Sequence, residues 1–233
     1  MRTPDAAELL ALADAPRALP LERQRLLLEG AWPGDAVGAD TPGERNERLL
    51  ALRRALFGPH MECVADCAGC GTLLELALDT DELGCAGRGR RGRDPITLNS
   101  PSGPLRFRLP TIDDVASVAC AGADAERSLA LACCVEGERA ELDNPELRSR
   151  LSQAFEAVDP LGHLVLELTC PECAAASHAV LDVGAALCAE IDALAERLLA
   201  EVHALASAYG WSEHDILALP VPRRRRYLAL LAQ

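Results

Sequence analysis

Residues 67–71 read Cys67-Ala-Gly-Cys70-Gly71, and residues 170–173 read Cys170-Pro-Glu-Cys173. Each C-x-x-C pair lies between two segments typical of β-strands, which are 60–66 and 72–78 for the first pair and 163–169 and 177–183 for the second. A strand, a C-x-x-C turn and a second strand form half of a zinc ribbon. Because two halves supply four thiolates, the sequence predicts one closed, tetrahedral Zn²⁺ site formed by Cys67, Cys70, Cys170 and Cys173.

Other arrangements of these cysteines stay open at the level of sequence. A local site could use Cys63, Cys67, Cys70 and Cys85, with Cys170 and Cys173 either paired to His178 or without metal. The two turns could also hold no metal. A redox C-x-x-C is disfavoured, because that motif normally opens a helix and here a strand follows each pair.

The composition limits the class of protein. The 233 residues are 49% apolar but only 3% aromatic, so the core is built from Leu, Ala and Val, which favours helices. The formal net charge of -13 argues against a general nucleic-acid coat and against a basic membrane-surface protein. No run approaches the ~20 apolar residues of a membrane span, and the first residues lack a signal-peptide layout. We therefore expect a cytoplasmic protein whose cysteines are reduced and serve as metal ligands or buried thiols.

Apolar spacing and capping patterns predict a mainly α protein with small β-hairpins, in which the paired C-x-x-C turns are inserted in a helical body. We expect helices over 6–13, 20–29, 42–57, 125–135, 145–158, 184–209, 213–219 and 222–231, with a short one after Thr111. A hairpin is expected from 96–99 and 104–109, because Leu105, Phe107 and Leu109 alternate with arginines. These elements suggest three consecutive regions of one compact unit, namely 1–58, 59–183 and 184–233.

No catalytic set is apparent in the sequence, and we expect a protein that is not an enzyme. His60 and Glu62 have the H-x-E form of zinc deaminases, but the P-C-x-x-C that should follow is absent. Cys133 and Cys134 have no assignable base or acid partner, so a thiol nucleophile is disfavoured. The cysteines outside the C-x-x-C pairs are expected to be buried and inert, namely Cys120, Cys133, Cys134 and Cys188.

Two basic patches stand out, the 88–93 loop and the run Arg223-Arg-Arg-Arg226. In an acidic chain, solvated arginines or contact with an acidic protein are favoured over nucleic acid. The run opens an amphipathic helix that could dock in a groove of a partner, or else pack on its own domain. The residues expected to contact a partner are Arg223, Arg224, Arg226, Tyr227, Leu228 and Leu231.

The chain resembles the family of the T4-type baseplate hub assembly protein, found in contractile phage tails and contractile injection systems. The segment most typical of it is 198–220, which reads LLAEVHALASAYGWSEHDILALP and is followed by the arginine run. Leu56-Phe-Gly58, Phe107-Arg-Leu-Pro-Thr111 and both C-x-x-C turns agree with it. The chain departs from the usual pattern at Ala68, where Pro is commoner, and at Ala174, where a turn glycine is usual.

The resemblance implies a non-enzymatic assembly factor, chaperone or minor component of a phage-like tail or injection-system baseplate. Its partners would be tail or baseplate proteins, and structural zinc would stabilise it. It would be cytoplasmic, with retention in the assembled particle left open. The alternative function is a zinc-ribbon regulator that binds nucleic acid, which strong salt-dependent binding to DNA or RNA would support.

Overall fold

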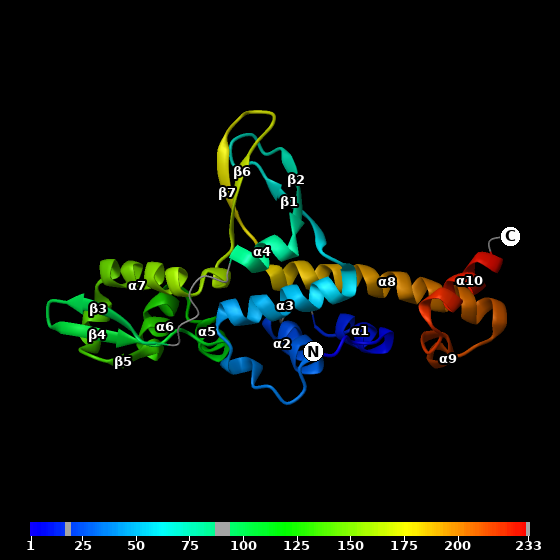
Figure 1. Cartoon of the computed structure of the whole chain (residues 1–233), viewed down its shortest axis with the longest axis horizontal. Coiled ribbons are helices and arrows are strands. Elements are labelled where there is room, and N and C mark those ends of the chain that lie inside the picture. The colour runs from blue at the N-terminus through cyan, green and yellow to red at the C-terminus, as the bar shows by residue number, and fades with distance from the viewer. Residues whose placement is uncertain (17–19, 87–93, 232–233) are drawn as a thin grey trace. The chain divides into compact units, whose positions relative to one another are not determined.

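The computed structural model of the chain describes residues 1–16, 20–86 and 94–231 (Figure 1). It is mainly helical with small antiparallel sheets of two or three strands, so the predicted fold class is confirmed. The basic loop at 88–93 lies outside the described residues. The chain divides into two compact units, of which one joins Met1–Pro33 to Gly184–Gln233 and the other is Gly34–Val183. This grouping differs from three consecutive regions, because the first helices pack with the last ones.

The regular elements described in the first unit are helices. They are α1 (Ala6–Ala13), α2 (Pro20–Ala31), α8 (Val183–Tyr209), α9 (Glu213–Leu217) and α10 (Val221–Leu231). Asp5 caps α1 in a capping box with Glu8, and Ser212 caps α9 by accepting from the Asp215 N–H. Gly210 ends the long helix with φ +69°, a left-handed conformation that favours glycine.

The core of the helical unit follows the predicted apolar stripe of α8. Leu187 and Ile191 are fully buried, and Ala195 and Leu198 pack against Leu10 of α1. Farther along α8, the buried residues Val202 and Leu205 pack against Ile216 of α9. The three-and-four spacing thus brings one face of α8 against the N-terminal helix and the C-terminal segment in turn.

The second unit contains the sheets. Its helices are α3 (Pro42–Phe57), α4 (Thr80–Ala86), α5 (Ile112–Val118), α6 (Ala125–Cys133) and α7 (Pro145–Val158), with 3₁₀ turns at Val37–Ala39, Gly122–Asp124, Arg139–Asp143 and Pro160–Gly162. Its strands are β1 (His60–Asp66), β2 (Leu73–Asp79), β3 (Ile96–Ser100), β4 (Gly103–Phe107), β5 (Cys134–Glu136), β6 (Val165–Thr169) and β7 (Ala176–Val180). They pair as β1-β2, β3-β4-β5 and β6-β7, all antiparallel.

The three-stranded sheet has its own core. Leu105 and Phe107 of β4 are fully buried, as their alternation with arginines predicts, and pack with Cys133, Leu142 and Leu151. The helix expected over 125–135 ends instead at Cys133. The reason is that the next residue, Cys134, has an extended conformation and pairs with Phe107, adding β5 as a third strand.

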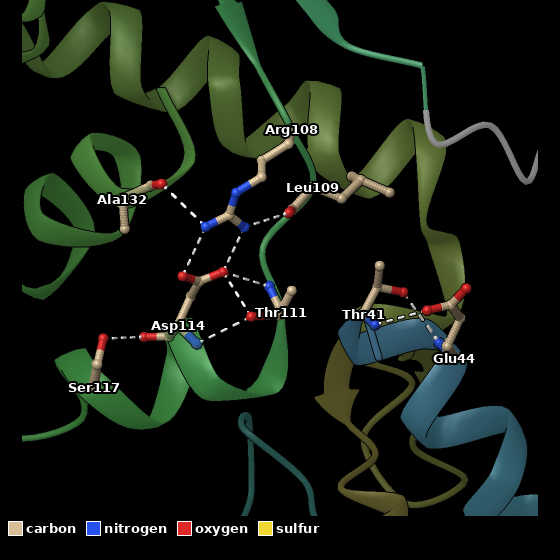
Figure 2. A network of polar contacts seen from close by, with 8 residues as sticks. All are labelled: Thr41, Glu44, Arg108, Leu109, Thr111, Asp114, Ser117 and Ala132. Atoms are coloured by element: carbon tan, nitrogen blue, oxygen red, sulfur yellow. Dashed lines mark hydrogen bonds and ion pairs between the residues drawn. The ribbon is translucent and has the colours of Figure 1, made fainter. Parts of the chain in front are cut away.

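A polar network anchors the start of α5 (Figure 2). The Arg108 guanidinium donates to both carboxylate oxygens of Asp114 at 2.6 and 2.9 Å, and also to the Ala132 carbonyl at 3.1 Å. Asp114 in turn accepts from the backbone N–H of Thr111 at 2.8 Å, which completes the predicted capping box. Thr41 and Glu44 form the same kind of box at the start of α3. The Arg108 network therefore joins the end of β4 to α5 and α6.

We expect the Asp114 network to make stability depend on acidity. Hydrogen bonds from Arg108 hold the pKa of Asp114 below its ordinary value, because they stabilise the carboxylate. A depressed folded-state pKa adds stability above the unfolded value of about 3.9, and this is lost as the pH falls through the folded value. Asp114→Asn should lower the free energy of unfolding at pH 7 by about 1.5–3 kcal/mol.

Urea unfolding at pH 7 and near pH 3 checks this prediction. The Asn variant should lose less stability on acidification than the wild type. Asp124→Asn, at an exposed position, serves as the matched control and should change stability by no more than about 0.5 kcal/mol. Equal acid sensitivity of the wild type and Asp114→Asn would show that this ion pair does not stabilise the fold.

Candidate metal centre

Two β-hairpins with equivalent turns carry the C-x-x-C pairs. In the first hairpin the Cys67 N–H donates to the Thr72 carbonyl and the Gly71 N–H donates to the Cys67 carbonyl, both at 2.9 Å. In the second, the Cys170 N–H donates to the Ala175 carbonyl at 3.0 Å, and the Ala174 N–H donates to the Cys170 carbonyl at 2.9 Å. The backbone pattern is therefore repeated, and each turn presents its two sulfurs on the same side.

The equivalent turns differ in one residue that adopts a left-handed conformation. Gly71 has φ +73° and Ala174 has φ +56°. Of the residues that the structure describes, Ala174 is the only one other than glycine that has a positive φ. A Cβ in this region costs about 1–2 kcal/mol, which glycine avoids. The departure of Ala174 from the usual turn glycine therefore places backbone strain beside Cys173.

Exchanging residues at these two positions should change stability in opposite directions. Ala174→Gly should raise the free energy of unfolding by about 1 kcal/mol, because relief of strain outweighs the added entropy of the unfolded chain. Gly71→Ala should lower it by about 1–2 kcal/mol. Denaturant unfolding of metal-loaded protein checks both, with Gly30→Ala as a helical control that a Cβ would not crowd. The same sign for the two changes would contradict the equivalence of the turns.

The two turns meet at one point. The sulfurs of Cys67, Cys70, Cys170 and Cys173 all lie within 4.8 Å of one another. The Cys67 and Cys173 sulfurs are 3.6 Å apart, and those of Cys70 and Cys170 are 3.7 Å apart. A tetrahedral metal with bonds of about 2.3 Å to sulfur needs sulfurs about 3.8 Å apart. The four cysteines could thus hold one metal ion.

The surroundings of the sulfurs are asymmetric. Cys67 and Cys170 are buried and pack with Leu74 of β2 and Leu168 of β6, whereas Cys70 and Cys173 are exposed. This small apolar cluster lies between the two hairpins, which run side by side (Figure 1). Apolar cover on one side keeps water from two of the four ligands and strengthens their attraction for a cation.

Hydrogen bonds favour ionisation of the first pair. The hydroxyl and the backbone N–H of Thr72 lower the pKa of Cys70 to about 6, and the N–H groups of Cys70 and Gly69 lower the pKa of Cys67. The Ala175 N–H lowers the pKa of Cys173, but the sulfurs of Cys70 and Cys67 raise it, to about 12. Four neighbouring thiols cannot all ionise without a positive charge among them, and a divalent cation supplies that charge.

The local arrangement of ligands considered from the sequence differs from this geometry. Cys63 pairs with Leu76 along the first hairpin and does not belong to the sulfur cluster. His178 is exposed on β7 opposite Glu167 and also lies outside the cluster. The side chain of Cys85 lies outside the described residues. Among the side chains that the structure describes, the shared arrangement is thus the one with metal-ligand geometry.

The other cysteines behave mostly as expected. Cys133, Cys134 and Cys188 are buried, and burial raises the pKa of Cys133 to about 12, so this thiol is protonated at neutral pH. Cys120 is exposed, so its expected burial is wrong. It follows α5, a helix that contains no buried residue, so this part of the chain lies at the surface.

The predicted partner-binding residues divide into two groups. Arg224 is buried and its Nε donates to Glu201 of α8 at 2.6 Å, so its assignment to a partner surface is wrong. Tyr227 packs edge-on against Tyr209 and Trp211, and Leu228 packs against the core around Leu205. These side chains hold α10 on its own unit, because the helix turns them inward. The exposed members of the set are Arg223, Arg226 and Leu231.

Comparison of the chain with protein-family models, curated proteins and solved structures finds no match. Among the residues that the structure describes, none of the helices has the length and apolar content to traverse a bilayer.

Proposed function

We propose that the chain is a non-enzymatic assembly factor or minor component of a phage-like tail or contractile injection baseplate, and that structural zinc stabilises it. The observation that carries the metal assignment is the sulfur cluster. It joins cysteines that are 100 and 106 positions apart, at the spacing that a tetrahedral Zn²⁺ needs. Among common metals, zinc is favoured because four thiolates in a tetrahedron suit it and reducing cytoplasm keeps thiols available.

The metal would act as a cross-link and not as a catalyst. Four protein ligands fill a tetrahedral shell, whereas catalytic zinc keeps one position for water or substrate. An isolated two-stranded hairpin is marginally stable, so each hairpin needs the other one and the metal to keep its form. A pair of hairpins held together by a metal suits a protein that acts by binding other proteins and not by catalysis.

Exposed apolar side chains support a role in protein contact. Val64 of β1 is 65% exposed, and Val180 of β7 is also 65% exposed. Val165 of β6 lies directly opposite Val180 and is 46% exposed, so the pair forms a β-branched patch on the outer face of that hairpin. Surface valines at paired positions favour burial against a partner protein. The resemblance of the 198–220 segment to baseplate hub assembly proteins supplies the class of partner.

A native pull-down of the tagged chain, read by mass spectrometry, tests the proposal. The chain should recover tail-tube, spike or baseplate proteins, and nuclease treatment should leave this recovery unchanged. A variant with Val165→Asp and Val180→Asp should recover less, while Val135→Asp on β5 provides an exposed valine control. Recovery of nucleic-acid-bound proteins that disappear with nuclease would instead favour the zinc-ribbon regulator. Recovery of neither class would contradict the assembly function.

A further inference from the structure

The C-terminal helix α10 has two distinct faces. Its inner face carries Arg224, Tyr227 and Leu228, which contact α8, α9 and the preceding turn. Residues spaced by three, four or seven positions share a face of a helix. Arg223, Arg226 and Leu230 have this spacing and lie on the outer face, where all three are exposed. We call these three residues the outer stripe of α10.

Within the described part of the chain, no carboxylate pairs with the exposed arginines of α10. The guanidinium groups of Arg223 and Arg226, and that of Arg225 beside the stripe, form no hydrogen bond or ion pair with any residue that the structure describes. Arg224 differs from them, because its guanidinium pairs with the Glu201 carboxylate. Acidic residues outnumber basic ones by 36 to 23 in this chain, so exposed arginines that pair with no described carboxylate are unexpected.

The position of the arginines along the helix adds to this imbalance. They lie in the first turns of α10, whose first turn holds no acidic residue. Cations near a helix N-terminus oppose the helix dipole, whereas carboxylates there stabilise it. The arginines thus raise the energy of the helix in the free protein. A bound carboxylate would neutralise them and interact favourably with the same helix end.

The outer stripe also contains an apolar residue. Leu230 is 58% exposed and lies one turn beyond Arg226. A phosphate polymer would neutralise the arginines but gains little from an exposed leucine. An acidic amphipathic helix satisfies both, because its glutamates pair with arginines and its apolar side chains cover the leucine. Charge complementarity together with Leu230 therefore favours a protein segment over nucleic acid.

We propose that Arg223, Arg226 and Leu230 form a docking surface for an acidic, amphipathic helical segment of a partner protein. This names the partner class for the proposed assembly function and rests on that function. The arginines set orientation and charge selectivity, and Leu230 supplies the contact that excludes water. The inner face of α10 keeps the helix in place, so the surface is presented on a fixed support.

Fluorescence anisotropy with the full chain tests this surface directly. The probe is a labelled helical peptide with glutamates and leucines on one face. A second peptide with serine in place of leucine and a single-stranded DNA serve as comparison probes. Arg226→Glu should weaken the binding of the first peptide about tenfold, because it removes an ion pair and adds repulsion. Leu230→Ser should weaken it about threefold or more, and the serine peptide should bind more weakly to the wild type.

A charge-matched control lies next to the stripe. Arg225→Glu makes the same change of charge one position away but on a different face of α10, so it should weaken binding by about twofold or less. Equal effects of Arg225→Glu and Arg226→Glu, tighter binding of the DNA than of the peptide, or absence of peptide binding would each overturn the proposal. The pull-down separates the two proposals. Recovery of tail proteins that Arg226→Glu leaves unchanged would sustain the function and reject this surface.

Discussion

The Cys170→Ser/Cys173→Ser variant is expected to lose its metal and the ordered packing of its two hairpins. Structural zinc contributes about 10–16 kcal/mol in zinc-finger peptides, which equals or exceeds the ~5–15 kcal/mol stability of a whole domain. The buried contacts between the hairpins involve few residues, chiefly Leu74 and Leu168 beside the ligands. They cannot replace an energy of that size. Hydrogen exchange should therefore accelerate throughout β1-β2 and β6-β7.

The three-stranded sheet should stay protected in this variant. Its core around Phe107 and Leu151 is a separate cluster that contains none of the four ligands. Cys120→Ser removes an exposed thiol outside the metal cluster and serves as control, with unchanged exchange and metal content. A chelator should reproduce the effect of the double substitution in the wild type. Retention of one metal per chain in the double variant would show that the ligands are local to the first hairpin.

The second large effect is expected at Arg224. Arg224→Ala should lower the free energy of unfolding by about 3–5 kcal/mol, because it leaves the partly buried Glu201 carboxylate without its counter-charge. Arg223→Ala, one position earlier and exposed, should change stability by no more than about 0.5 kcal/mol. Urea unfolding followed by Trp211 fluorescence reports on this region, since Trp211 packs against Tyr227.

Comparing variants of Arg223 and Arg224 separates a residue that is exposed for partner contact from one that stabilises the fold. A double change of Arg224→Ala with Glu201→Ala should cost less than Arg224→Ala alone, because no unpaired charge is left buried. Similar stabilities of Arg223→Ala and Arg224→Ala would contradict the division of α10 into an inner and an outer face.

Local signals were sufficient to predict most elements and the four cysteines whose sulfurs come together. Capping residues such as Thr41 and Thr111 mark helix starts. Their side chains accept hydrogen bonds from backbone N–H groups of the first turn, which have no acceptor within the helix. The C-x-x-C turns were predictable because two thiols at this spacing can reach one cation. The pairing of Cys70 with Cys170 was favoured because each pair alone leaves a tetrahedral metal half coordinated, but a local site with Cys63 and Cys85 stayed open until the structure brought the four sulfurs together.

Tertiary contacts determine what the sequence could not show. The run of four arginines has no apolar period, so nothing in it distinguishes the buried Arg224 from its exposed neighbours. Its burial depends on Glu201, which α8 places beside it from 23 positions away. The strand β5 was missed because three residues after a helix carry too weak an alternation, and pairing with β4 decides their conformation. The joining of the chain's two ends in one unit is likewise a matter of packing.

X-ray absorption at the zinc edge, on protein purified without added metal, tests most directly whether one zinc joins the two hairpins. We expect about one zinc per chain with four sulfur neighbours at about 2.3 Å, a shell that the Cys170→Ser/Cys173→Ser variant lacks. A shell with nitrogen or oxygen ligands in the wild type, or a folded chain without zinc, would contradict it.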